Sequence, residues 1–206
     1  MGHSPTAASG NSTQARPDLV IVQAPVVRPG TLSQRFPRGS RLVRLAPSEP
    51  TPRSLTPDFF AAADPRTSFD GARVLFAGKK TAASPWQIWE MNVEGSGARQ
   101  VTHCSGDCLK PAYLPRGLIV FTALAEGPAE HSLINSKAPR SAFPAAHAAS
   151  RQPEGSQLWV SKLDGSDAHP ITFGPGDFQV ETVLKNGMIL ATARSPLLPS
   201  SELPAD

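Results

Sequence analysis

The chain of 206 residues has a mass of 21.8 kDa, which leaves room for one sizeable hydrophobic core or two small ones. Its basic residues give a net charge of +3 but are scattered, and no apolar run approaches the roughly 18 residues of a membrane helix, so neither a nucleic-acid surface nor a transmembrane segment is expected. Proline numbers 22, about twice its usual share of roughly 5%, which argues against long helices and leaves part of the chain outside any core.

The first segment, residues 1–17, is rich in Ser, Thr, Ala, Gly and Pro and predicts a disordered polar tether. It lacks the basic start and apolar segment of a signal peptide. Because a polar tether of this kind is common just after a signal peptide that has been removed, the sequence leaves export open. The densest basic stretch, RFPRGSRLVR at 35–44, fits a phosphate or lipid-headgroup contact, although a solvated loop and strand edge is favoured for it.

The rest of the chain contains an internal sequence repeat. QIWEMNVEGSGARQVT at 87–102 returns in register as QLWVSKLDGSDAHPIT at 157–172, and RLVRLAPSEPTPRSLT at 41–56 aligns with both as a degenerate copy. Each closing threonine is followed, fifteen residues later, by a glycine in a turn. The period is 46 residues from the first threonine to the second and 70 to the third, so the last unit carries an insertion of 24 residues.

Each unit predicts four short strands. A first strand, such as DPRTS or KPAYL, leads into the glycine turn, and a nearly all-apolar strand follows, such as RVLFA or LIVFTAL. A Gln-x-Trp strand and a closing strand come next, joined by EG or DG, a hairpin signal whose glycine supplies a positive φ. The repeat-defining structural positions are Asp70, Gly71, Trp89, Gly95, Thr102, Gly117, Trp159, Asp164, Gly165, Thr172 and Gly187.

Four-stranded antiparallel units repeating every 40 to 50 residues or so are typical of β-propeller blades, whereas a leucine-rich solenoid needs a shorter period. The sequence therefore predicts an all-β fold, a partial (incomplete) β-propeller of about three to four four-stranded antiparallel blades. The expected blades lie at about 18–57, 58–103 and 109–173, with a half blade at 177–195, an insertion at 125–156 and a disordered tail at 196–206. The insertion predicts either a rim loop with a weak helix near 143–150 or disorder.

The sequence motifs of the repeat resemble those of a known family. The turn SFDG at 68–71, the x-I-W strand, the hairpin and the closing Thr are similar to the TolB-type, WD-like repeat of periplasmic propellers. The residue-by-residue sequence of 61–124 resembles the middle propeller domain of hydrazine synthase alpha subunit-like proteins. The resemblance covers roughly 18–195 and implies fold far more strongly than activity.

Catalytic motifs are missing from the sequence. No G-x-S-x-G, H-E-x-x-H or phosphate-binding glycine loop is present, and the C-x-x-C-H motif that holds c-type haem in the synthase family is absent. No catalytic residue, cofactor or metal site is therefore expected in this chain.

The two cysteines, Cys104 and Cys108, leave three readings open. They form a disulfide if the protein is exported, remain free thiols in a cytosolic chain, or bind zinc together with His103, although that site would lack a fourth ligand. The matching tryptophans could stack on a ligand, but packing between blades is favoured. Asp64, Asp70 and Asp107 fit either a polar rim or turn-forming side chains.

Two functions from different classes fit these observations. The first is a non-catalytic binding or scaffold module of the bacterial cell envelope, periplasmic or secreted, with a cytoplasmic location left open. It would contact a protein partner or small ligand at a propeller rim, and its open blade edges could self-associate. The second is the propeller portion of a multi-domain haem-containing redox enzyme similar to the hydrazine synthase alpha subunit. A third hypothesis, with less support, is the gating propeller of a peptidase. Both leading readings make the chain a piece of a longer protein or an open arc.

Overall fold

The computed structural model describes residues 17–27, 32–124, 155–174 and 176–194. The predicted tether and tail and most of the insertion, including its helix near 143–150, fall almost entirely outside these residues. The described part contains strands and two short 3-10 turns, η1 (Leu32–Gln34) and η2 (Pro115–Gly117), with no α-helix. None of its helical segments has the length and apolar character needed to cross a membrane.

The strands form successive sheets in chain order. We call β1 to β3 blade 1, β4 to β7 blade 2, β8 to β11 blade 3, and β12 with β13 the half-blade. Blade 1 has three strands, and its β1 stands in the second-strand position of the repeat. Neighbouring strands within each blade are antiparallel, and one parallel bridge between Ser156 and Asp177 joins the half-blade to blade 3. The strands are β1 (Leu19–Gln23), β2 (Arg41–Leu45), β3 (Arg53–Ser54), β4 (Ala61–Thr67), β5 (Arg73–Lys79), β6 (Gln87–Asn92), β7 (Arg99–Gln100), β8 (Cys108–Leu114), β9 (Leu118–Leu124), β10 (Ser156–Lys162), β11 (His169–Pro170), β12 (Asp177–Val183) and β13 (Ile189–Arg194).

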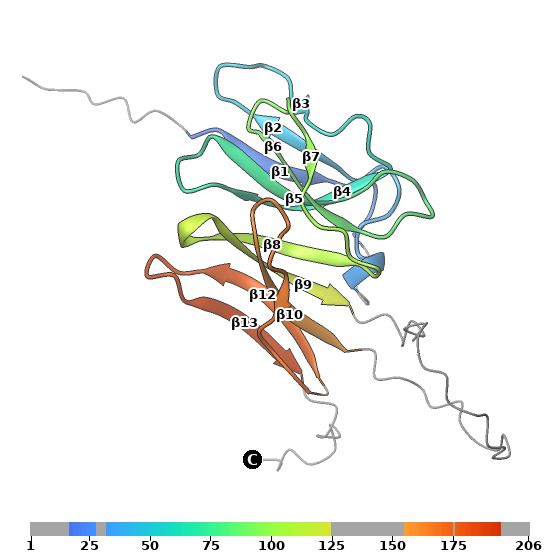
Figure 1. Ribbon diagram of the computed structural model, residues 1–206. Helices are drawn as coiled ribbons and strands as arrows, with labels where there is room; N and C mark the ends of the chain where they lie inside the picture. Colours follow the sequence, from blue (N-terminus) through green and yellow to red (C-terminus); the bar gives the residue numbers. More distant parts are fainter. Residues whose placement is uncertain (1–16, 28–31, 125–154, 175, 195–206) are drawn as a thin grey trace, which may run out of the picture.

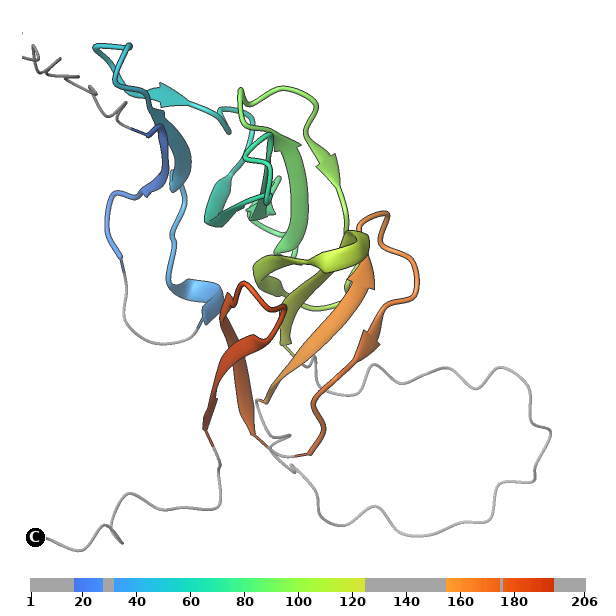
Figure 2. The ribbon, with the colours of Figure 1, turned by 90° about the vertical axis from the view of Figure 1, so that its left-hand side faces the viewer.

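The blades follow one another face to face in an arc that does not close on itself (Figures 1 and 2). The first strands of successive blades, β4, β8 and β12, lie next to one another. This is the predicted all-β partial propeller.

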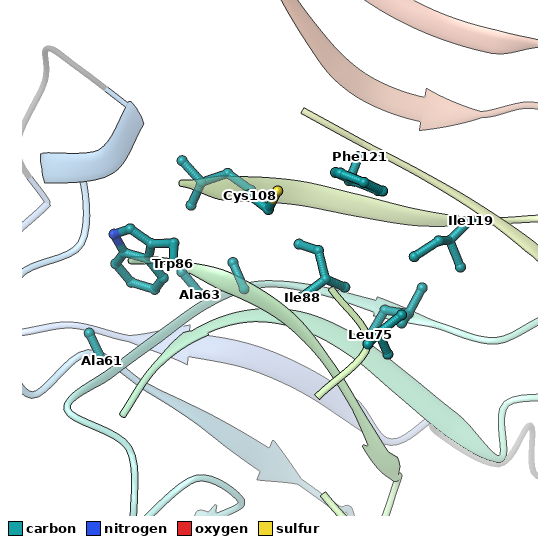
Figure 3. Close-up of a cluster of buried hydrophobic side chains, with 11 residues drawn as sticks. Ala61, Ala63, Leu75, Trp86, Ile88, Cys108, Ile119 and Phe121 are labelled. Atoms are coloured by element: carbon teal, nitrogen blue, oxygen red, sulfur yellow. The ribbon is translucent and has the colours of Figure 1, made fainter. Parts of the chain in front are cut away.

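The hydrophobic core is divided into three layers, one between each pair of consecutive blades. Leu42, Val74 and Phe76 pack between blades 1 and 2, whereas Leu75 and Phe121 belong to the layer between blades 2 and 3 (Figure 3). Val120 packs between blade 3 and the half-blade. Since alternate side chains of one strand enter different layers, the second strand of a blade must be apolar on both faces, which is why its sequence does not alternate.

A hydrogen-bonded lock closes each blade and explains the repeated Gln and Thr. The Thr102 hydroxyl accepts from the Ile88 N–H (2.8 Å) and donates to Gln87 Oε1 (2.9 Å). The Gln87 amide also pairs with the backbone of Cys104, accepting from its N–H and donating to its carbonyl. Buried polar groups are thereby satisfied where β7 leaves the sheet.

The lock recurs in the other blades. Thr172 makes the same two contacts with Gln157 and Leu158, both at 2.8 Å. In blade 1, Thr56 accepts from the Leu42 N–H at 2.9 Å, but Arg41 replaces the glutamine. The closing threonine therefore acts in all three blades, and its glutamine partner in two.

The strand-pairing registers correct the residue offset between equivalent positions of blades 2 and 3. Phe76 pairs with Trp89 and Phe121 pairs with Trp159, so β5 and β9 correspond with an offset of 45 residues, although the predicted unit is 46. Blade 2 carries one more residue than blade 3 between its turn glycine and the paired phenylalanine. Equivalent positions of β5 and β9 are therefore the ones that the Phe76–Trp89 and Phe121–Trp159 pairs align.

Replacing Thr102 by Val keeps the side-chain shape but leaves the buried Ile88 N–H without its acceptor. We expect the free energy of unfolding, measured by urea denaturation, to fall by about 1–3 kcal/mol. Thr67→Val, at an exposed position near the end of β4, is the matched control and should change it by less than about 0.5 kcal/mol. Equal effects of the two substitutions would contradict the lock.

Candidate functional site

A cavity of about 500 Å³ lies between blades 2 and 3. Its apolar side is formed by Phe121 and Leu124 of β9 and by Trp159 of β10. The connection from β7 to β8 forms another side. The remaining lining residues are Thr102, His103, Cys104, Ser105, Gly106, Ala123, Gln157, Ser161, Gly165 and Ala168.

The structure joins Cys104 and Cys108 in a disulfide beside this cavity. Cys108 is fully buried in the layer between blades 2 and 3, and Cys104 is clamped by the Gln87 amide. The same connection is held by Asp107, whose carboxylate accepts from the Trp86 N–H at 2.7 Å. The wall of the cavity is therefore fixed by a covalent bond and by three hydrogen bonds.

The two matching tryptophans lie in different surroundings. Trp89 packs edge-on against Phe59, with ring centroids 5.0 Å apart, and the Lys80 ammonium lies 5.0 Å from its ring centroid. Trp159 lines the cavity. Trp89 also borders a cavity, a smaller one of about 290 Å³, so this position of the repeat lies beside open space in both blades.

A second polar cluster lies where the three adjacent first strands bulge. Asp64 of β4 and Lys110 of β8 have positive φ values of 51° and 48°, and each precedes a proline. The Lys110 N–H donates to Asp64 Oδ2 at 3.2 Å, and its ammonium bonds Glu181 of β12 at 2.9 Å. Arg66 reaches the Glu181 carbonyl at 2.7 Å. We call Asp64, Arg66, Lys110 and Glu181 the axial cluster; it ties blades 2 and 3 to the half-blade.

The two carboxylates of the axial cluster are perturbed in opposite directions. Burial raises the pKa of Asp64, against the opposing attraction of Arg35 and the hydrogen bond from Lys110. The hydrogen bond from the Lys110 ammonium instead holds the pKa of Glu181 below its ordinary value. The Lys110 ammonium therefore stabilises the charge of Glu181, whereas burial disfavours the charge of Asp64.

Glu90 is fully buried on β6 and accepts from groups of both blades. Arg73 and Arg99 bond its Oε2, and the Tyr113 hydroxyl of β8 donates to its Oε1 at 3.0 Å. Burial and then the charge of Glu90 raise the pKa of Tyr113. Arg99 also bonds the Leu163 carbonyl of blade 3 at 3.0 Å, so this network, which the repeat did not predict, joins blades 2 and 3.

The remaining repeat positions serve turns and blade contacts. Asp70 and Asp164 each accept from a serine and a backbone N–H within two residues, and the bonds from Ser68 and Ser166 lower the pKa of Asp70 and of Asp164, respectively. A Cβ at Gly165 would collide with the Val101 carbonyl of blade 2, so a glycine is needed there. Positive φ values are found at Gly71, Gly95, Gly117, Gly165 and Gly187.

The predicted candidates therefore do not converge on one reactive centre. Asp64, Asp70 and Asp107 belong to the axial cluster, a hairpin turn and a backbone cap, respectively. In the part of the chain that the structure describes, no three His, Cys, Asp or Glu side chains gather as metal ligands.

The chain resembles a known protein in sequence over about half of its length. No protein-family model matches the chain. Hydrazine synthase subunit alpha of Kuenenia stuttgartiensis is 38% identical over 105 residues, which are 49% of this chain but 13% of that protein.

Two solved structures share the fold. Kuenenia stuttgartiensis hydrazine synthase superposes with a TM-score of 0.64 and 22% identity, over 84% of this chain and 27% of that one. TolB from Acinetobacter baumannii gives a TM-score of 0.52 and 17% identity, over 78% and 33%. The chain thus shares its propeller fold with these proteins and spans a minor part of their length.

The axial cluster predicts opposite pH dependences for two substitutions. The raised pKa of Asp64 means that its contribution to stability falls as pH rises from about 4 through the folded pKa. Asp64→Asn, which tolerates positive φ, should therefore raise the free energy of unfolding at pH 7, and the gain should shrink toward pH 4.

Glu181→Gln should do the reverse, because the lowered pKa of Glu181 stabilises the fold above about pH 4.5 and this contribution disappears as pH falls through the folded pKa. Urea denaturation between pH 3 and 7 measures both substitutions. Effects of the same sign at pH 7 would contradict this electrostatic account.

Proposed function

We propose that this chain is a non-catalytic binding and scaffold module of the bacterial cell envelope, which assembles through the uncovered faces of its terminal blades. The supporting observation is the exposure of apolar positions on β13 and on the turn that precedes it. Leu184, Met188 and Leu190 are 41%, 57% and 52% exposed. A face of this kind requires a cover in solution.

The repeat identifies what normally covers these positions. Their equivalents 70 residues earlier are Leu114, Leu118 and Val120, which pack in the layer between blade 3 and the half-blade. Val120 is fully buried, whereas Leu190 is half-exposed. The exposed face is therefore the one that blade 3 buries against the half-blade.

The other end of the arc offers the complementary surface. On β1, Val20 and Val22 pack toward blade 2, whereas Leu19 and Ile21 point away from it and are 51% and 40% exposed. The two ends are thus the two halves of an interface that the arc uses three times internally. We propose a second copy of this chain as the occupant, because two arcs supply four four-stranded blades, two three-stranded blades and two half-blades, within the roughly four to eight blades of closed propellers.

Location in the envelope is supported by the disulfide, since such bonds persist in oxidising compartments. The absence from the sequence of nucleophile, metal-binding and haem motifs supports a binding role.

A second candidate function rests on the 38% identity to hydrazine synthase subunit alpha. In it, the chain is the propeller portion of a multi-domain haem-containing redox enzyme, and other domains perform the chemistry. Sequencing of the gene and its flanks tests this candidate: in-frame C-x-x-C-H motifs would support it, and their absence from the whole frame would contradict it.

Multi-angle light scattering of the purified chain tests self-association. We expect a concentration-dependent dimer, and Leu190→Glu should shift it to monomer because a charge would be buried at the joint. Phe69→Glu, at a 72% exposed residue in the turn between β4 and β5, is the control and should leave the dimer unchanged. A monomeric wild-type chain, or a dimer insensitive to Leu190→Glu, would contradict the proposal.

A further inference from the structure

Blade 2 contains an internal template for the cavity. Phe59, in the connection from blade 1, packs edge-on against Trp89 and against Phe76, with ring centroids 5.0 Å and 5.2 Å apart. Its ring lies so close to β5 that a Cβ at Gly78 would come within 2.8 Å of it. Three aromatic rings thus pack against one another in the layer between blades 1 and 2, and a smaller cavity of about 290 Å³ remains beside Trp89 and Gly78.

The corresponding place between blades 2 and 3 has lost one ring. Eight residues separate Thr56 from the bulge residue Asp64, and eight separate Thr102 from its counterpart Lys110, so the two connections align without a gap. In this alignment Ser105 stands where Phe59 stands. The other two rings are kept, as Trp159 and Phe121.

A second side chain is also shortened. Met91, which is 1% exposed, packs in the layer between blades 1 and 2. Its counterpart 70 residues later is Ser161, which is equally buried and lines the cavity. The cavity of about 500 Å³ is therefore bordered by two positions, Ser105 and Ser161, whose counterparts in blade 2 carry larger apolar side chains.

We propose that this cavity binds a small, uncharged aryl-alkyl molecule. Its ring lies against Trp159 and Phe121, displaced from the place of the Phe59 ring by the Cβ of Ala123, the counterpart of Gly78, and its alkyl group extends toward Ser161. Aromatic rings prefer such edge-to-face contacts over contacts with saturated groups of the same size. The volume lies within the range of small-molecule sites.

The lining also selects against charge. Among the residues that the structure places around the cavity there is no Asp, Glu, Lys or Arg. The Thr102 hydroxyl and the Gln157 amide are engaged in the blade locks, and the Ser161 hydroxyl donates to the Lys162 carbonyl. His103 Nδ1 pairs with Gln100, so His103 Nε2 and the Ser105 hydroxyl are left to meet a polar group of the ligand at the exposed wall. This site does not depend on the proposed self-association, since none of its residues lies on the terminal faces.

The test uses 4-ethylphenol as probe and 4-ethylcyclohexanol as its non-aromatic match, titrated into the full chain by isothermal calorimetry. We expect one site for 4-ethylphenol and about tenfold weaker binding of 4-ethylcyclohexanol, because the saturated ring loses both edge-to-face contacts. Equal affinities would overturn the assignment of an aromatic ligand. Tighter binding of N-acetyltyrosine amide than of 4-ethylphenol would overturn a small molecule as the natural source of the ring.

Two variants restore the missing side chains independently. Ser105→Phe returns the ring of blade 2 and Ser161→Met returns its thioether chain, and each should weaken 4-ethylphenol binding at least about tenfold by filling the cavity. Ala82→Phe adds a ring at an exposed position outside the lining and should leave the affinity unchanged. Circular dichroism verifies that each variant is folded. Wild-type affinity in either filled variant, or no binding to the wild-type chain, would overturn the proposal.

Discussion

The stacking of one blade on the next is the constraint on which the rest of this structure depends. A four-stranded sheet this small buries enough apolar surface only when both of its faces are covered, so each second strand sends alternate side chains into two different layers. Leu75, Val120 and Leu190 occupy equivalent positions, and their exposure follows from this constraint. The first two are covered by blade 3 and by the half-blade and are fully buried, whereas no described residue covers the third, which is half-exposed.

Because stacking requires a fixed distance between blades, the connections between them must be held firmly. The Thr–Gln lock performs this task at the closing strand of blades 2 and 3, and the bulges of the adjacent first strands, with Asp64, Lys110 and Glu181, perform it at the other side. Glu90 adds a buried ionic joint between blades 2 and 3. With the connection from Thr102 to Cys108 held in place, a deletion of side-chain volume at Ser105 leaves a cavity, since the blades cannot move together to fill it.

The spacing of the repeat was sufficient to predict the blades, since turn glycines, hairpins and apolar second strands are local features. It did not predict what Gln87 and Thr102 do, because that lock joins side chains fifteen residues apart across a sheet edge, nor the ion pairs of Glu90, whose counterpart in blade 3 is Val160. The cavity had a signal in the sequence: Ser105 opposite Phe59 and Ser161 opposite Met91. That signal is readable only once the structure shows that these positions lie beside equivalent pairs of aromatic rings in the two layers.

The most direct test of this account is to locate a bound aromatic ring relative to the two rings that the repeat conserves. Intermolecular nuclear Overhauser effects from 4-ethylphenol to the ¹³C-labelled chain would be measured. The account predicts contacts from the probe ring to Trp159 and Phe121, and from its ethyl group to the β-protons of Ser161. Contacts confined to the exposed Leu184, Met188 and Leu190, or to no defined site, would contradict it.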